Sequence, residues 1–238
     1  ITARNHMRKS SLIRVESPEN WAYALIALQT GGAFGGAGLR HTARLSSGYG
    51  ARIFTGLTPS LQPARHMRRD FEVLVANRAR ILEENPFFAA DGVGLLWCER
   101  WEGDEAADLG RLDPWFFDHP RRLRLDVVED RTVCRYTATS SERVQTRFGD
   151  VHLQGRLGDP WTPVDLVKNA AMTMVDQSFD YRLVSKILWD RAHIQRPLML
   201  EHAPYAGDGD APWLVAQAVC GGKSRTRWSE RVMRLPCA

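Results

Sequence analysis

The chain has 238 residues, a formal net charge of +4 and a sequence pI near 9.0. This length is sufficient for one large hydrophobic core or two small ones, and 44% hydrophobic and 25% charged residues are ordinary values for a globular protein. No run approaches the roughly 18 consecutive apolar residues that a membrane span requires. We therefore expect no membrane span, and the sequence contains no internal repeat or low-complexity segment.

Arginine dominates the basic residues, because lysine occurs only at Lys9, Lys168, Lys186 and Lys223 and arginine supplies the other 28 of the 32. Arginine forks suit phosphates and base edges, whereas a GC-rich genome would also favour arginine codons. The four cysteines lack the spacing of a zinc site, and we expect them to be reduced and buried in a cytoplasmic protein. They are Cys98, Cys134, Cys220 and Cys237.

The first half of the chain predicts two helices and a short strand. Residues 17–30 form a helix with Ser17 as N-cap, Pro18 at the first position, and an inward face carrying Trp21, Leu25 and Leu28. Five glycines follow between residues 31 and 38, and residues 43–57 then predict a turn and a strand. The longest helix spans residues 65–85, with its arginines outward. Its expected inward residues are Phe71, Leu74, Val75 and Leu82.

The second half predicts strands joined by short turns. Residues 94–101 indicate a buried strand, and residues 112–120 a short helix with Asp113 as N-cap. Alternation of apolar and polar residues on both sides of residues 129–132 predicts a hairpin over 121–140. After a turn-rich connector at 158–165 and a helix at 180–190, a second hairpin is expected over 213–236, around residues 221–228. The whole chain, 1–238, is therefore predicted to be a single α+β domain: a mixed body with short antiparallel hairpins and a few helices.

The nucleotide-binding motifs that the glycines suggest do not fit. The sequence GGKS at residues 221–224 ends like a phosphate-binding loop, but the first glycine of that motif would fall on Gln217. The glycines at 31–38 lack the dinucleotide-loop spacing and follow a predicted helix rather than a strand. The stretch is therefore not a mononucleotide cradle.

No catalytic or metal-binding pattern is recognisable among the histidines and acids. The seven histidines lack metal-ligand spacing, and Ser46 and Ser47 lack the sequence around a hydrolase nucleophile. A hydrolase or transferase that uses acids such as Asp208 and Asp210 is the enzymatic alternative, although a solvated loop explains these residues as well. We expect no catalytic residue, no metal and no cofactor.

Six segments together resemble the CasA family, the large subunits of the type I-E CRISPR surveillance complex Cascade. Their order and spacing extend over nearly the whole chain. The segments are ITARNH at 1–6, ALIALQT at 24–30 with the glycines after it, ARLSSGYGAR at 43–52, LDPWFFDHPRRLRL at 112–125, GDPWTPVD at 158–165 and GGKSRTRWSERVMRLP at 221–236.

The resemblance implies a non-enzymatic, cytoplasmic, DNA-binding subunit of a ribonucleoprotein complex for antiviral defence. Such subunits read the protospacer-adjacent motif (PAM) in double-stranded target DNA, start strand separation and help recruit a helicase-nuclease. Guide-RNA pairing reads the rest of the target sequence. The implied partners are the other Cascade subunits, the crRNA, duplex DNA and, transiently, the helicase-nuclease, with no membrane.

The resemblance also implies three DNA-contacting elements. A glycine loop that approaches the PAM resembles Ala33, Phe34, Gly35 and Gly36, and small residues would let the backbone come close to DNA. A basic side chain that enters the minor groove from a hairpin strand falls on Arg143. The alternatives are a flexible turn at the glycines and an exposed strand charge at Arg143.

The third implied element is a wedge at the tip of the second hairpin that opens the first base pair. It matches Arg225, Thr226 or Arg227, and Lys223 is placed to hold the displaced phosphates with Arg225 and Arg227. An ordinary solvated hairpin tip is the alternative. The tip is one residue longer and richer in arginine than is common in the family.

Compared with the family, the chain corresponds to the α+β body alone, without the opening segment and without the C-terminal helical bundle. It is then either part of a longer polypeptide or a shorter large subunit whose helical partner is a separate chain. Some members hold a cysteine-ligated zinc, and the matching cysteines are missing here. A purely architectural subunit, which contacts protein or crRNA and never reads DNA, is the remaining alternative.

Overall fold

The computed structural model describes most of the chain between residues 17 and 235. The described ranges are 17–31, 44–45, 51–119, 121–141, 143–145, 153–174, 178–201, 211–220 and 227–235. Within these ranges, only the backbone is described at residues 27, 28, 30, 31, 136, 220 and 227.

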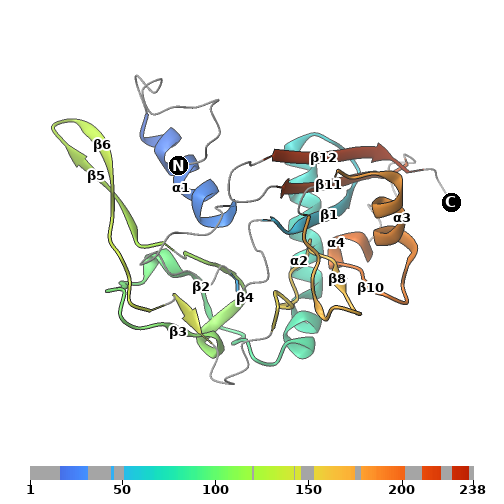
Figure 1. Cartoon of the computed structure of the whole chain (residues 1–238), viewed down its shortest axis with the longest axis horizontal. Helices are drawn as coiled ribbons and strands as arrows, with labels where there is room; N and C mark the ends of the chain where they lie inside the picture. The colour runs from blue at the N-terminus through green and yellow to red at the C-terminus, as the bar shows by residue number, and fades with distance from the viewer. Residues whose placement is uncertain are drawn as a thin grey trace.

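The described part of the chain contains helices near both ends and a run of short strands between α2 and α3 (Figure 1). The helices are α1 (Pro18–Gly31), α2 (Pro63–Glu84), α3 (Tyr181–Trp189) and α4 (Leu198–Glu201), with the 3₁₀ turns η3 (Leu96–Cys98) and η4 (Leu109–Arg111). The strands of the first half are β1 (Ile53–Thr58), β2 (Val93–Leu95), β3 (Ala107–Asp108), β4 (Leu112–Phe117), β5 (Leu123–Val128) and β6 (Arg131–Tyr136). The remaining strands are β7 (Val144–Gln145), β8 (Val164–Asp165), β9 (Ala170–Ala171), β10 (Ile194–Gln195), β11 (Trp213–Cys220) and β12 (Arg227–Arg234).

The largest sheet joins one strand from the first half of the chain to the two last strands. Its order is β1-β11-β12, and both pairings are antiparallel. β11 and β12 are paired along their full length, from Trp213 with Arg234 to Cys220 with Arg227. Residues 221–226 therefore connect the two strands at one end of the hairpin.

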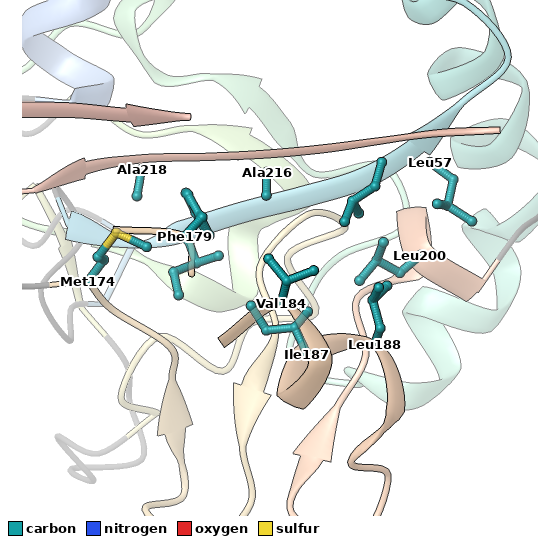
Figure 2. Close-up of a cluster of buried hydrophobic side chains, with 11 residues drawn as sticks. Leu57, Met174, Phe179, Val184, Ile187, Leu188, Leu200, Ala216 and Ala218 are labelled. Atoms are coloured by element: carbon teal, nitrogen blue, oxygen red, sulfur yellow. The ribbon is translucent and has the colours of Figure 1, made fainter. Parts of the chain in front are cut away.

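The first hydrophobic core lies between this sheet and the helices α3 and α4. Figure 2 shows Leu57 of β1 and Ala216 and Ala218 of β11 facing Ile187 of α3 and Leu200 of α4. Alternate residues of β11 share this face because successive side chains in a strand point to opposite sides. Burial of each large aliphatic side chain contributes about 1.5–3 kcal/mol to folding, so this core stabilises the sheet that carries the second hairpin.

A second core surrounds the parallel pair β2–β4 and the parallel pair β3–β7. Leu96, Leu109, Leu112 and Phe116 are each no more than 2% exposed and pack together there. The hairpin β5–β6 follows directly after β4 and projects from this part of the molecule (Figure 1).

Several predictions from the sequence are confirmed. The fold is α+β, both hairpins form, and α1, α2 and α3 occur where the periodicity places them. The turn between β5 and β6 consists of Glu129 and Asp130, which adopt φ angles of 49° and 58°. Two consecutive left-handed residues are typical of the tight turns that match the twist of a hairpin.

The predicted helix at residues 112–120 is wrong, because this segment forms strand β4. Leu112, Pro114 and Phe116 are buried while the residues between them are half-buried, which is the period of a strand. Pro114 is tolerated because, among the described strands, β4 pairs only with β2 and keeps an edge on which a missing N–H costs little. Asp113 Oδ1 does accept a hydrogen bond from the backbone N of Trp115 at 2.8 Å, but it caps no helix.

The predicted inward face of α2 is also partly wrong. Phe71 and Val75 are 61% and 72% exposed, whereas Arg69 and Ile81 are buried. Arg69 Nη2 donates to the backbone oxygen of Met199 at 3.0 Å, and Nη1 donates to Asp70 Oδ1 at 2.9 Å. A polar contact with α4 therefore replaces the expected apolar contact on this side of the helix.

Two smaller predictions need correction. The buried strand expected at residues 94–101 is shorter, because β2 ends at Leu95 and a 3₁₀ turn follows. Cys98 and Cys134 are exposed rather than buried, and neither forms a disulfide with a described residue. None of the helices in the described ranges has the length and apolar composition needed to cross a membrane.

Candidate nucleic-acid interface

Gln29 and Arg44, the residues that flank the glycine-rich stretch in the described part of the chain, both bind the segment between β4 and β5. At the first end, Gln29 Nε2 donates to the backbone oxygen of Arg121 at 2.8 Å, and the backbone N of Arg121 donates to Gln29 Oε1 at 3.1 Å. At the other end, the backbone N of Arg44 donates to Asp118 Oδ2 at 2.6 Å. The predicted PAM-approaching residues Ala33, Phe34, Gly35 and Gly36 lie between these attachments but outside the described residues.

The side chain of Arg44 binds the backbone of β4. Its Nη1 donates to the backbone oxygen of Phe116 at 2.7 Å, and its Nη2 donates to that of Pro114 at 3.1 Å. The guanidinium also lies over the Phe116 ring, 4.6 Å from the ring centroid. These contacts fix Arg44, which follows the glycine stretch in sequence, against a strand of the second core.

Arg143 differs from its predicted position in two respects. It immediately precedes β7, which pairs in parallel with β3, so it does not belong to a hairpin strand. Its side chain is buried, its Nη2 donates to the backbone oxygen of Leu96 at 2.8 Å, and its guanidinium lies 5.2 Å from the centroid of the Trp101 ring. The alternative of an exposed strand charge is therefore wrong, and in this geometry the guanidinium is not presented to a DNA groove as the minor-groove prediction requires.

The tip of the second hairpin is positioned by the pairing of β11 with β12. Lys223, Arg225 and Thr226 lie in the connection outside the described residues. For Arg227, the structure describes the backbone, which pairs with Cys220 at the end of the ladder. The predicted wedge residues thus follow directly from a continuous pair of strands anchored in the first core.

A cavity of about 370 Å³ lies between these elements. Arg44, which follows the last glycine of the stretch by six residues, lines it, and residues 115–118 line it from β4 and the residue after it. Val219 and Trp228 line it from the second hairpin, where they form the pair next to the last one, Cys220 with Arg227. The cavity is therefore lined by a residue that follows the glycine stretch in sequence and by a pair near the end of the second hairpin.

Aromatic rings form most of the cavity wall. Phe54 of β1, Trp115 and Phe117 of β4, Trp161 of the connector before β8, and Trp228 of β12 all line it. Trp228 is 61% exposed, so one side of the wall is open to solvent.

Asp118 is the buried carboxyl group in this wall. Its side chain is 1% exposed, and burial raises its pKa to about 7 against the opposing effect of the backbone N–H and guanidinium of Arg44 and the guanidinium of Arg143. Arg143 does not line the cavity, but its positive charge lowers the pKa of Asp118, which does. The neighbouring His119 has its pKa lowered to about 4, first by burial and then by Arg143.

A second carboxylate, Asp159, holds two arginines at the inner side of the cavity. Its Oδ2 lies 3.7 Å from Arg44 Nε and 3.7 Å from Arg52 Nη1. Arg52 Nη2 also donates to the backbone oxygen of Arg44 at 3.0 Å. Gly155 makes room for this cluster, because a Cβ at its position would lie 2.4 Å from Arg52 Nη2 and its φ is +77°.

Asp118, Asp159 and Arg44 were not predicted as site residues. The sequence predicts a helix around Asp118, and a helical interpretation does not bring alternate residues to one face. In the structure, alternate residues of this strand share one buried face: Leu112, Pro114, Phe116 and Asp118. An acid at an inward position of an otherwise apolar strand is the signal that could have identified Asp118.

The alternative enzymatic site is not supported by the described part of the chain. Asp208 and Asp210 lie outside it, and the described residues contain no group of three or more histidine, cysteine, aspartate or glutamate side chains that could hold a metal ion. Comparison of the sequence with protein-family models and with curated proteins finds no match.

Proposed function

We propose that this protein is the PAM-recognising large subunit of a crRNA-guided surveillance complex of the type I-E Cascade class. In this role it binds the PAM in duplex DNA, promotes the first strand separation and helps to recruit the helicase-nuclease in cytoplasmic antiviral defence. The guide RNA reads the remaining target sequence by base pairing, so the protein itself needs no catalytic residue.

The observation that carries the proposal is the convergence of elements that are remote in sequence. Arg44, which follows the glycine stretch in sequence, and Val219 and Trp228, which precede and follow the tip connection, line the same cavity. In the proposal, a duplex that contacts the glycine stretch also reaches the hairpin tip. Recognition and strand opening require this proximity, because the wedge must act at the base pair next to the motif that is read.

The charge of the chain supports the same role. Arginine supplies 28 of the 32 basic residues, and the tip connection and its flank carry Lys223, Arg225 and Arg227 within five positions. Cations at a hairpin tip can neutralise phosphates of the two strands as they separate, and the displaced counterions favour binding.

The proposal is tested by co-expressing the chain with guide RNA and the other subunits of such a complex. We expect it to co-purify with the guide RNA. In the assembled complex, the double variant Arg225→Ala with Arg227→Ala should weaken binding of a PAM-containing duplex by at least about tenfold and reduce the salt dependence of binding.

Arg68→Ala is the matched control, since Arg68 is an exposed arginine on α2 that pairs with Glu72. This variant should bind the duplex like the wild type. Failure to assemble with guide RNA, or equal losses from the tip variant and the control, would contradict the proposal.

An architectural role is the second candidate, and one surface favours it. Met67, Phe71 and Val75 lie four residues apart on α2 and are 57%, 61% and 72% exposed. They form one stripe of the helix, as residues four apart do, and such a stripe suits a protein contact. An architectural subunit would bind intact and scrambled PAM targets equally, which separates the two roles.

A further inference from the structure

A second cavity, of about 900 Å³, is formed by the β5–β6 hairpin and the segment around η3. Residues 97–102 line it from η3 and the segment that follows, and Arg124, Asp126 and Arg135 line it from the hairpin. Among the described residues, none lines both this cavity and the aromatic cavity. Its volume falls within the range of small-ligand sites.

Two arginines of the hairpin share one carboxylate in this cavity. Asp126 Oδ1 lies 2.8 Å from Arg124 Nε, and Asp126 Oδ2 lies 3.1 Å from Arg135 Nε. The arginine side chains are 81% and 66% exposed, so their guanidiniums are accessible to a ligand. These three residues, the Asp126 group, carry a net charge of +1.

The same arrangement occurs on the other element of the cavity. Glu102 pairs with Arg100, and Glu102 Oε2 lies 3.0 Å from Arg122 Nη2. These three residues, the Glu102 group, also carry a net charge of +1. A further acid in the wall, Glu99, pairs with Arg111 at 3.1 Å and does not cancel this surplus. The cavity therefore suits an anion, and arginine forks bind phosphate oxygens in pairs.

Two tryptophans add flat apolar surface to the same wall. The Trp97 ring lies 4.8 Å from the Phe117 ring, measured between centroids, and Trp97 is 37% exposed. Trp101 Nε1 donates to the backbone oxygen of Glu105 at 2.8 Å, and the guanidinium of Arg143 lies 5.2 Å from the centroid of its ring. These contacts hold the rings in place, so a planar group that stacks on them immobilises little that is free.

We propose that this cavity binds single-stranded nucleic acid, with phosphates on the Asp126 group and the Glu102 group and a base stacked on Trp97. Charged grooves that contain aromatic rings bind single strands in this way, largely without regard to sequence. A duplex would offer phosphates but keep its base faces stacked, and an acidic peptide would offer charge without a base. The inference goes beyond the proposed function, because this site is separate from the glycine stretch and the hairpin tip and does not depend on PAM reading.

The test measures binding of a short fluorescein-labelled oligodeoxythymidine to the purified full chain by fluorescence anisotropy at fixed low salt. We expect the double variant Arg124→Ala with Arg135→Ala to weaken binding by about tenfold, because it removes both cations of the Asp126 group. Arg68→Ala with Arg80→Ala is the matched control, since it removes the same charge from two partly exposed arginines of α2. Equal losses from the two double variants would overturn the proposal.

Removing a carboxylate from the cavity should have the opposite effect. Glu102→Gln leaves Arg100 and Arg122 without the negative charge that they share, so binding should tighten by about threefold. Glu72→Gln is the matched control, because it removes the same charge beside Arg68 on α2 and should leave binding unchanged. Unchanged or weaker binding by Glu102→Gln would contradict a phosphate on this group.

Stacking is tested separately. Trp97→Leu retains an apolar side chain against Phe117 and should weaken binding by about fivefold or more. Unlabelled oligouridine should compete with the probe as oligodeoxythymidine does, whereas polyglutamate of the same length should compete poorly. Unchanged binding by Trp97→Leu, or equal competition by polyglutamate, would overturn the proposal and indicate a site for acidic peptides. The arginine variants change exposed side chains, so the test remains decisive if Trp97→Leu does not fold.

The site and the proposed function can fail separately. Discrimination between intact and scrambled PAM duplexes by the assembled complex, together with unchanged single-strand binding by the cavity variants, would overturn only the site. Single-strand binding that depends on Arg124, Arg135 and Trp97, without PAM discrimination, would overturn only the PAM-reading role.

Discussion

Arg69 shows at the scale of a single residue why the interior of this protein is not purely apolar. Arg69 lies on α2 and its side chain is buried. It donates hydrogen bonds to Met199 of α4 and to Asp70. Both contacts must remain satisfied, because removing one partner of a buried ion pair leaves the other without compensation.

We predict that Arg69→Leu lowers the free energy of unfolding by about 3 kcal/mol, because the substitution leaves the carboxylate of Asp70 and the carbonyl of Met199 without this donor. Arg68→Leu is the matched control, since the Arg68 side chain is 82% exposed and its pair with Glu72 lies at the surface. This control should change stability by less than about 0.5 kcal/mol. Urea unfolding of the two variants measures both values, and equal effects would contradict a structural role of the buried guanidinium.

Asp118 gives a pH-dependent prediction. Its pKa is near 3.8 in the unfolded chain and about 7 in the folded protein, so the folded state binds more protons between these values. Stability contributed by this group therefore falls as the pH rises from about 4 to about 7. His119, whose pKa falls from 6.5 to about 4 on folding, acts in the opposite direction between about pH 4 and pH 6.5.

The contribution of Asp118 is isolated by comparing wild type with Asp118→Asn. We predict that the wild type loses stability relative to the variant between pH 4 and pH 8, by an amount on the order of 4 kcal/mol. Denaturant unfolding at several pH values measures the difference. A difference that stays constant with pH would show that the carboxyl titrates as it does in the unfolded chain.

At the scale of elements, the parallel pair β2–β4 depends on one glycine. A Cβ at Gly92 would lie 2.3 Å from the backbone carbonyl carbon of Leu112, whereas a Cβ at Gly94 would have no described atom within 4 Å. Gly92 therefore leaves no room for a Cβ atom, whereas Gly94, two positions further along, does.

We predict that Gly92→Ala destabilises the protein by about 3 kcal/mol, because the backbone of β4 must move away from the added methyl group. Gly94→Ala should be neutral or stabilising by up to about 1 kcal/mol, since alanine loses less backbone entropy than glycine in a strand. Thermal unfolding of both variants measures the contrast. If the two substitutions had equal effects, the close approach at Gly92 would not hold.

The elements that local signals specify were predictable from the sequence. Ser17 and Pro18 identify the start of α1, the alternation around Glu129 and Asp130 identifies a hairpin, and the periodicity of α3 identifies a helix. The segment 112–120 was mistaken for a helix because Asp-Pro at its start is equally compatible with a helix N-terminus and an edge strand. Its pairing with β2 is a tertiary contact that no local signal contains.

The candidate site was predictable only in part, for the same reason. The sequence places the glycine stretch and the hairpin tip, and the resemblance relates both to DNA. The burial of Arg143 arises from contacts with Leu96 and Trp101, more than 40 residues earlier in the chain. The aromatic cavity around Asp118 arises from packing between β4, β1 and the second hairpin, which are also remote in sequence. The periodicity of a sequence carries no information on contacts between elements that are remote in the chain.

At the scale of the whole molecule, the cavity lies where the two hydrophobic cores adjoin. Phe54 and Trp228 reach it from the sheet of the first core, while Phe116 reaches it from the second core and Trp161 from the connector before β8. Arg44, which follows the glycine stretch, binds on the side of the second core, and β11 and β12, which lead to the hairpin tip, belong to the sheet of the first core. This arrangement would place motif recognition and strand opening on two independently stabilised supports.

The central claim is that this protein reads the PAM, and the most direct test is equilibrium binding of duplex targets by the assembled guide-RNA complex at fixed salt. One set of targets carries intact candidate motifs and the matched set carries the same sequence with the motif scrambled. We predict at least about tenfold tighter binding of one intact motif, corresponding to about 1.4 kcal/mol or more. Equal affinity for every intact and scrambled target would contradict the account and leave an architectural subunit.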